Sequence, residues 1–280
     1  MSGGKMARWT DEEMPLTFLE EARKFIDENK QKPFFLFYAL TEPHVPRMPS
    51  TLFKGKSGLG LRGDAILQID WTVGQIQAQL KMLGIEKNTM IIFSSDNGPV
   101  LDDGYVDEAV IKLNGHTPSG QFRGGKYSSY EAGTRVPTIV SWPAQIKSGM
   151  TSNALVCQID LLSSLAKLVQ YDLPNDLQID ASIQLNAWIG KDEIGRSYLI
   201  EQGMKPNAIL KGEWKLIMPT KGPAISKYTN IELGNATEPQ LYNLKSDPGE
   251  KSNIAHLYPE IKKILSELFI KETASFLIND

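Results

Sequence analysis

The stretch "TMIIFSSDNGPV" at residues 89–100 joins a run of β-branched and aromatic residues to an acid, an amide, a glycine and a proline. Its apolar part predicts a strand buried on both faces. Its polar end permits two interpretations. Asp96 and Asn97 can form a turn, because Asp, Asn, Gly and Pro dominate turns. Alternatively, they bring side-chain oxygens to the carboxyl edge of a sheet, where open α/β proteins build their sites.

The segments before this stretch predict an α/β fold. Apolar residues recur at helical spacing from Phe18 through Asn29 and again over residues 61–83, and residues 32–40, "KPFFLFYAL", form a second continuous apolar run. Helices that alternate with apolar strands indicate a mostly parallel sheet covered on both faces. We therefore expect an α/β domain with a mostly parallel sheet.

The segments after it change character near Arg196. A further strand is expected within residues 134–143 and a helix within residues 153–170. Beyond Arg196, short alternating pieces separated by turns predict a small antiparallel sheet, followed by a helix from about Tyr258. The predicted division is an α/β domain over residues 1–195 and a small α+β subdomain over residues 196–280.

Composition narrows the classes of partner. The 280 residues carry a formal net charge of -3 and contain no long basic run, so neither nucleic acid nor an anionic membrane is expected as a partner. No apolar run approaches the ~20 residues that span a bilayer, and the first residues lack the apolar core of a signal peptide. The single cysteine, Cys157, lies in an apolar stretch and is interpreted as structural.

A second polar feature follows the apolar run at residues 32–40. In "TEPHVPRMP", His44 lies between Pro43 and Pro46, whose rings restrict the backbone on both sides of the imidazole. It can be a histidine on a surface turn. If both apolar runs are parallel strands, however, His44 and Asp96 lie at the same edge of the sheet, where α/β ligands bind.

The glycine-rich stretch "NGHTPSGQFRGGKYSSYEAGTRVP" at residues 114–137 contains His116, Arg123 and Lys126. Glycines let the backbone approach an anion, lysine supplies a mobile point charge and arginine a two-pronged donor. The alternative is a solvated loop whose glycines only form turns. By contrast, "LYNLKSDPGEKSNIA" at residues 241–255 contains ordinary turn residues and is assigned to structure.

Taken together and in this order, "KPFFLFYALTEPHVP", "IIFSSDNGP", "FRGGKYSSYEAGTRVP" and "LYNLKSDPGEKSNIA" resemble the formylglycine-dependent sulfatases of the alkaline-phosphatase-like superfamily, most of all the bacterial arylsulfatase-type enzymes. The resemblance runs from about residue 8 to the C-terminus. It implies an incomplete sulfatase-like α/β sandwich with a small C-terminal antiparallel sheet and a terminal helix. It also implies a hydrolase of sulfated aryl esters or glycans, and a periplasmic or extracellular location.

The resemblance implies roles residue by residue. Asp96 and Asn97 would be calcium ligands, and His44 and Lys126 would contact the sulfate. His116 would lie near the leaving group of the substrate, and Arg123 is a further candidate for substrate binding. This chemistry suits the residue types, because charge that develops on sulfuryl oxygens needs a cation and the leaving oxygen needs a proton donor.

Parts of the family pattern are absent from these 280 residues. There is no Cys/Ser-x-Pro/Ala-x-Arg motif to yield the formylglycine nucleophile, and Cys157 is followed by "QIDLL". The paired aspartates that complete the calcium site are absent too. We therefore expect the carboxyl-terminal portion of a sulfatase, inactive alone, which self-associates through surfaces that the full protein covers.

Two other functions stay open at this point. One is a phosphate or phosphonate ester hydrolase of the same superfamily, which commonly needs more Asp and His ligands than a chain with three histidines offers. The other is a non-catalytic module that binds sulfated glycans through His44, His116, Arg123 and Lys126.

Overall fold

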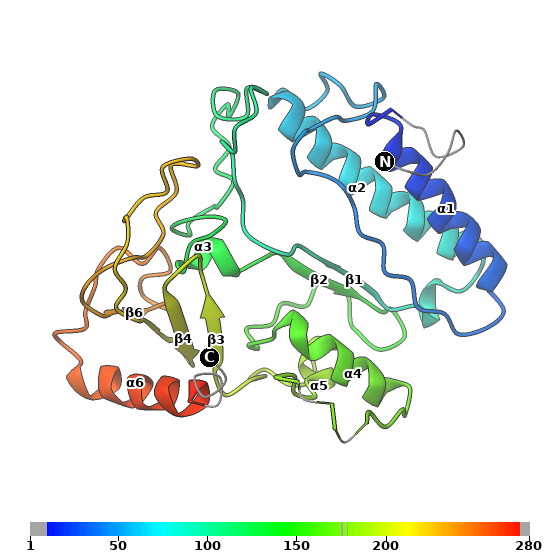
Figure 1. The fold of residues 1–280 in the computed structure, drawn as a ribbon. Helices are drawn as coiled ribbons and strands as arrows, with labels where there is room; N and C mark the ends of the chain where they lie inside the picture. Colours follow the sequence, from blue (N-terminus) through cyan, green and yellow to red (C-terminus); the bar gives the residue numbers. More distant parts are fainter. Residues whose placement is uncertain (1–9, 175, 178, 275–280) are drawn as a thin grey trace. The chain divides into compact units, whose positions relative to one another are not determined.

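The computed structural model describes residues 10–174, 176–177 and 179–274, which divide into two compact units (Figure 1). The first unit comprises Met1–Thr89 and Leu101–Thr117, and the second comprises Met90–Val100 and Pro118–Asp280. The second unit contains residues on both sides of residue 195, and a domain boundary there stays a prediction.

Two helices form the core of the first unit. α1 (Met14–Asn29) packs against α2 (Gly60–Met82), and a short 3-10 helix, η2 (Glu86–Asn88), follows. The two helices bury apolar side chains between them and are joined by the Gln79 side chain, whose amide donates to the Arg23 carbonyl at 2.7 Å. The buried apolar residues are Leu19, Ala22, Ile26, Ala65 and Leu80. Both helices expected from the sequence are thus confirmed.

The strand expected over residues 32–40 is not formed. In the described part of the chain this segment belongs to no strand, and Phe35 and Phe37 are 72% and 81% exposed. A run of apolar residues predicts burial on both faces, but burial also requires neighbouring strands that supply hydrogen bonds. The prediction was wrong because periodicity says nothing about whether those neighbours are present.

The second unit begins with a two-stranded sheet. β1 (Ile91–Ser94) pairs with β2 (Thr138–Ser141) in antiparallel register, with Ile91 opposite Ser141. The mixed α/β class is confirmed, but the mostly parallel sheet is not found among the described residues. Apolar runs report burial, and they carry no information on strand direction. The remaining short helices of this part are α3 (Glu131–Thr134), η3 (Gln158–Asp160), α4 (Leu161–Leu168) and α5 (Leu185–Trp188).

A four-stranded antiparallel sheet and a helix complete the second unit. The strands β3 (Leu199–Gln202), β4 (Asn207–Lys211), β5 (Trp214–Ile217) and β6 (Gln240–Asn243) lie in sequence order, each antiparallel to the next. α6 (Pro259–Thr273) follows the last strand. This is the antiparallel sheet with a terminal helix that the alternating pattern beyond Arg196 predicts.

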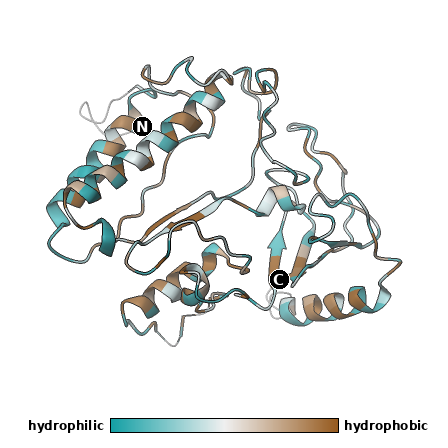
Figure 2. Ribbon diagram, turned by 180° about the vertical axis from the view of Figure 1, so that it is seen from behind, coloured by the Kyte–Doolittle hydropathy of each residue, from teal (hydrophilic) through white to brown (hydrophobic). Residues whose placement is uncertain are grey.

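The two faces of this sheet contact different parts of the second unit. On one face, Ile209, Leu216 and Leu241 pack with Leu265 of α6, and apolar and polar residues alternate along that helix (Figure 2). Burying one such leucine stabilises the fold by about 2 kcal/mol. On the other face, Ala208, Ile217 and Tyr242 pack against Tyr130. The sheet therefore supports the glycine-rich segment that contains the candidate residues.

Candidate functional site

Asp96 and Asn97 lie directly after β1, where the chain turns. Asp96 is exposed, and its carboxylate accepts the Asn97 backbone N–H at 3.0 Å. The Asn97 amide donates to the Gly98 carbonyl at 3.0 Å. Among the described residues no donor reaches the Asn97 Oδ1 or the second Asp96 oxygen, so the turn leaves side-chain oxygens available to a cation.

One backbone hydrogen bond joins this turn to α3, and a second joins it to the Gly-Gly-Lys loop, residues 124–126. Gly98 N–H donates to the Gly133 carbonyl at 3.0 Å, and Lys126 N–H donates to the Pro99 carbonyl at 2.9 Å. The contact leaves no room for side chains, since a Cβ on Gly98 would lie 1.6 Å from the Ala132 carbonyl oxygen. The structure therefore brings the segment with Asp96 and the segment with Lys126 together within one unit.

Lys126 carries a positive charge that the described chain does not neutralise. Its side chain is half-buried, and its Nζ lies 5.4 Å from the centre of the Tyr127 ring. No carboxylate of the described residues forms an ion pair with it. An ammonium group without an acidic partner, beside a glycine-rich backbone, is suited to an anion.

Arg123, in contrast, is engaged within the fold. Its guanidinium donates to both Glu232 oxygens at 2.9 and 2.6 Å and to the Glu250 carbonyl at 2.8 Å, and it stacks 4.0 Å from the centre of the Tyr130 ring. The hydrogen bonds that Arg123 donates to Glu232 raise the pKa of Arg123 and lower that of Glu232. These contacts fix the start of the loop, beside a hollow of about 440 Å³ lined by Gln121, Phe122, Arg123, Glu232, Gly249 and Lys251.

His44 belongs to the first unit and is exposed. Its Nδ1 donates to the Val45 carbonyl at 2.7 Å, because a carbonyl can only accept. The hydrogen of a neutral ring is therefore on Nδ1, and Nε2 faces no protein partner among the described residues. A ring held in this way can accept a proton at Nε2 and then donate it.

His116, also in the first unit, has the opposite tautomer. Its Nδ1 lies 3.2 Å from a terminal nitrogen of Arg62. Since arginine can only donate, Nδ1 must accept and the hydrogen of the ring is on Nε2. Arg62 is 4% exposed, and burial together with Arg47 lowers its pKa. Sequence reasoning missed Arg62, although an arginine inside an apolar helical pattern was a visible signal.

Each unit thus holds part of the predicted set. Asp96, Asn97, Arg123 and Lys126 lie in the second unit, and both histidines lie in the first. Within the described residues, no group of three or more His, Cys, Asp or Glu side chains is arranged to hold a metal ion. Calcium takes six to eight oxygen ligands, so the residues at the turn fit a share of such a site and not the whole of it.

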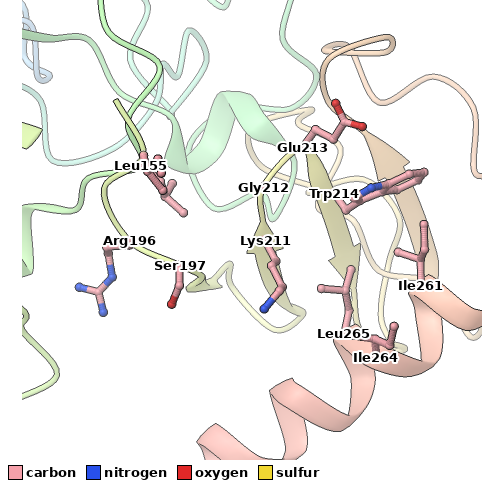
Figure 3. Close-up of a pocket in the computed structure, with 11 residues that line it drawn as sticks. Leu155, Arg196, Ser197, Lys211, Gly212, Glu213, Trp214, Ile261, Ile264 and Leu265 are labelled. Atoms are coloured by element: carbon pink, nitrogen blue, oxygen red, sulfur yellow. The ribbon is translucent and has the colours of Figure 1, made fainter. Parts of the chain in front are cut away.

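A larger hollow in the second unit contains none of the predicted site residues. It measures about 580 Å³ and lies between β5, α6 and residues 194–197 (Figure 3). Trp214, Ile261, Ile264 and Leu265 line one side, Arg196 and Ser197 line the other, and Lys211 lies between them. It is mostly apolar and offers no cluster of ligating groups.

Comparison with known proteins defines the class. Residues 10–171 match the sulfatase family, and residues 124–274 match the C-terminal family of N-sulphoglucosamine sulphohydrolase. The chain belongs to the sulfatase family. This confirms the resemblance drawn from the sequence motifs. None of the helices in the described part of the chain has the length and hydropathy needed to span a bilayer.

Particular relatives are similar over nearly the whole chain. An N-acetylgalactosamine-6-O-sulfatase of Bacteroides thetaiotaomicron is 51% identical over 96% of this chain and 52% of its own length. Human arylsulfatase A is 31% identical over 86% of this chain and 49% of its own length. A solved structure from work on the metabolism of glycosaminoglycans by B. thetaiotaomicron superposes with a TM-score of 0.93 at 50% identity, covering 97% of this chain and 57% of that one. The chain therefore spans about half the length of the curated relatives it matches.

Proposed function

We propose that this chain contributes the carboxyl-terminal part of a calcium-dependent sulfatase site that acts on sulfated glycans. The observation that carries the proposal is the position of the Asp96-Asn97 turn, which the Lys126–Pro99 hydrogen bond joins to the Lys126 loop and the Gly98–Gly133 hydrogen bond joins to α3. A carboxylate and an amide oxygen suit a hard cation, and the unpaired ammonium suits a sulfate. Membership of the sulfatase family supports both assignments.

Calcium, when bound, would stabilise negative charge on the sulfuryl oxygens. Asp96 and Asn97 would hold it with two oxygens. Lys126 would add a second positive charge at the sulfate, in a loop whose position is fixed before the substrate arrives. Arg123 would act by holding that loop, because Glu232, the Glu250 carbonyl and the Tyr130 ring already occupy its guanidinium.

The two histidines would have different tasks. His44, with Nδ1 bonded to the Val45 carbonyl, would present Nε2 to the sulfate or to the leaving oxygen and would donate from the protonated ring. His116, with Nδ1 bonded to Arg62, would present a fixed Nε2–H to the leaving-group sugar while staying neutral. These 280 residues contain no formylglycine motif, so we expect them to bind ligands without hydrolysing them.

For the substrate, we propose a glycan with 6-sulfated N-acetylgalactosamine. The support is the 51% identity to the B. thetaiotaomicron enzyme named for that sugar. The phosphate or phosphonate hydrolase alternative gains no support from the described residues, which hold no further Asp and His cluster. We also propose that the chain self-associates through surfaces that the full protein would cover. The proposed location is periplasmic or extracellular.

Calorimetric titration of the chain with calcium tests the metal part of the proposal. We expect weak binding, with a Kd of about 10⁻³ M because few ligands are present, and loss of the binding in Asp96→Ala. Asp172→Ala, which removes another exposed carboxylate of the same unit, is the control and should bind as the unmodified chain does. Equal binding by all three proteins would reject Asp96 as a ligand.

A further inference from the structure

Four ionisable side chains are buried together behind the Gly-Gly-Lys loop. Lys215 of β5 and Glu250 are fully buried, and Glu131 of α3 and Glu201 of β3 are 1% and 9% exposed. The Lys215 Nζ lies 2.9 Å from Glu131, 3.0 Å from Glu201 and 3.6 Å from Glu250. We refer to these four residues as the Lys215 cluster.

This arrangement is costly for a part that serves only stability. Desolvating an ion costs several kcal/mol, and apolar residues of similar volume often do as well or better. Burial favours a neutral Lys215, yet the carboxylates of Glu201, Glu131 and Glu250 outweigh burial and raise the pKa of its ammonium. We therefore expect the position of a segment of the chain to depend on these four groups.

The Lys215 cluster holds α3. Glu131 is the first residue of this helix, and its backbone N–H donates to the Glu250 carboxylate at 2.6 Å. Its own carboxylate accepts from Lys215 at 2.9 Å and from Arg135, in the same helix turn, at 3.1 Å. Both the backbone and the side chain of Glu131 are thus fixed by residues of the C-terminal sheet and of the turn after it.

α3 in turn holds the two candidate ligand segments. The Gly133 carbonyl accepts the Gly98 N–H at 3.0 Å, and Ala132 N–H donates to the Arg123 carbonyl at 2.9 Å. A Cβ on Gly133 would lie 2.1 Å from the Ser128 carbonyl oxygen. This close packing means that α3 cannot shift without moving the Asp96-Asn97 turn and the loop that presents Lys126.

We propose that Lys215 is a positioning residue, which acts through Glu131 and Glu250 to fix α3 and thereby the spacing between the Asp96-Asn97 turn and the Lys126 loop. This role rests on the proposed function only in the assignment of those two segments to calcium and sulfate. The C-terminal sheet then supports the site through the face that carries Lys215, which is turned to the loop, while its opposite face packs on α6.

Hydrogen exchange measured by mass spectrometry on the 280-residue chain tests the proposal. In Lys215→Met and Glu250→Ala, peptides over residues 123–135 should exchange about tenfold faster or more, because a charge-assisted hydrogen bond is lost. Peptides over residues 207–217, in β4 and β5, should change less. Glu250→Gln keeps an acceptor for the Glu131 N–H and should restore slow exchange in the loop.

Asp160→Ala is the matched control. Asp160 is a buried carboxylate of the same unit that pairs with Arg196 and accepts from Ser182, so its loss should leave residues 123–135 protected. Unchanged exchange of the loop in Glu250→Ala, or an equal rise in loop and sheet, would overturn the proposal. The comparison of Glu250→Ala with Glu250→Gln tests the proposal even if Lys215→Met does not fold.

The result is separable from the proposed function. Selective loosening of the loop supports the positioning role whether or not the chain binds calcium. Absence of calcium binding by the unmodified chain would count against the proposed function and leave the positioning of α3 standing.

Discussion

Lys215 and Lys126 are two lysines of the same unit with opposite surroundings. Lys215 is fully buried among three carboxylates, whereas Lys126 is half-buried and lacks an acidic partner among the described residues. A charge matched inside the chain contributes to the fold, and an unmatched charge beside small residues is available to a ligand. The comparison therefore predicts that substitutions at the two places separate stability from binding.

The largest effect on stability is expected from Lys215→Met. This substitution removes the one buried cation that three buried carboxylates share, of which Glu131 alone keeps a second partner in Arg135. Removing one partner of a buried pair costs about 3–5 kcal/mol. Urea unfolding should show a fall of that size in the free energy of unfolding. Lys147→Met, at an exposed lysine of the same unit, is the control. A loss below about 1 kcal/mol, as for a surface ion pair, would contradict the comparison.

The next effect is a dependence of stability on pH that comes from Glu250. Burial raises its pKa from 4.5 to about 7, even though Lys215 opposes the shift. The folded chain therefore holds a proton that the unfolded chain releases, and the free energy of unfolding should fall as pH rises from about 4.5 to about 7. The expected loss is roughly 3 kcal/mol.

Glu250→Gln should remove this slope, because the amide does not titrate. The other charged groups near Glu250 are Lys215, Glu131 and Glu201, with Arg135 bonded to Glu131 and Arg123 bonded to the Glu250 carbonyl. The pKa of Glu131 is lowered, since Lys215 and Arg135 outweigh its burial, and its contribution therefore changes below pH 4.5. A slope between pH 4.5 and 7 that survives in Glu250→Gln would assign the titration to another group.

A smaller effect is expected from Arg123→Ala. The substitution removes two hydrogen bonds to Glu232 and one to the Glu250 carbonyl. Both charged side chains are partly exposed, so solvent reduces the value of the pair and the loss should be about 1–2 kcal/mol. Arg123→Lys should recover less than half of it, because an ammonium cannot reproduce the two-pronged geometry. Full recovery would show that charge alone matters there.

The smallest effect on stability is expected from Asp96→Ala. The exposed carboxylate accepts one neighbouring backbone N–H, so the free energy of unfolding should change by less than about 0.5 kcal/mol. Calcium binding, in contrast, should be lost. A destabilisation comparable with that of Lys215→Met would mean that Asp96 serves the fold.

Helices and strands were predicted correctly where a local pattern of apolar residues is enough to define them. The helical spacing of α2 and the alternation in β3 to β6 are local properties, and both elements form as expected. The apolar run at residues 32–40 was misread, because a strand depends on partners that periodicity does not reveal. For the same reason the antiparallel pairing of β1 with β2 was not foreseen.

The candidate residues show the same limit. Asp96 and Lys126 could be named because their motifs are short and polar, and the structure joins their segments. The residues of the Lys215 cluster could not be predicted from the sequence. Glu131, Lys215 and Glu250 are separated by long stretches of sequence and meet through the packing of the sheet against the loop. The one available signal was a lysine inside the apolar alternation of β5.

The most direct test of the account is a comparison of sulfated and unsulfated sugar at Lys126. In the presence of calcium, N-acetylgalactosamine 6-sulfate and N-acetylgalactosamine would be titrated into the unmodified chain, Lys126→Ala and Lys147→Ala, with amide chemical shifts as the readout. We predict that the sulfated sugar binds the unmodified chain and Lys147→Ala equally well. Its affinity for Lys126→Ala should be lower by a factor of about ten or more. Equal affinity for both sugars, or equal binding by Lys126→Ala, would contradict the assignment of this loop to sulfate.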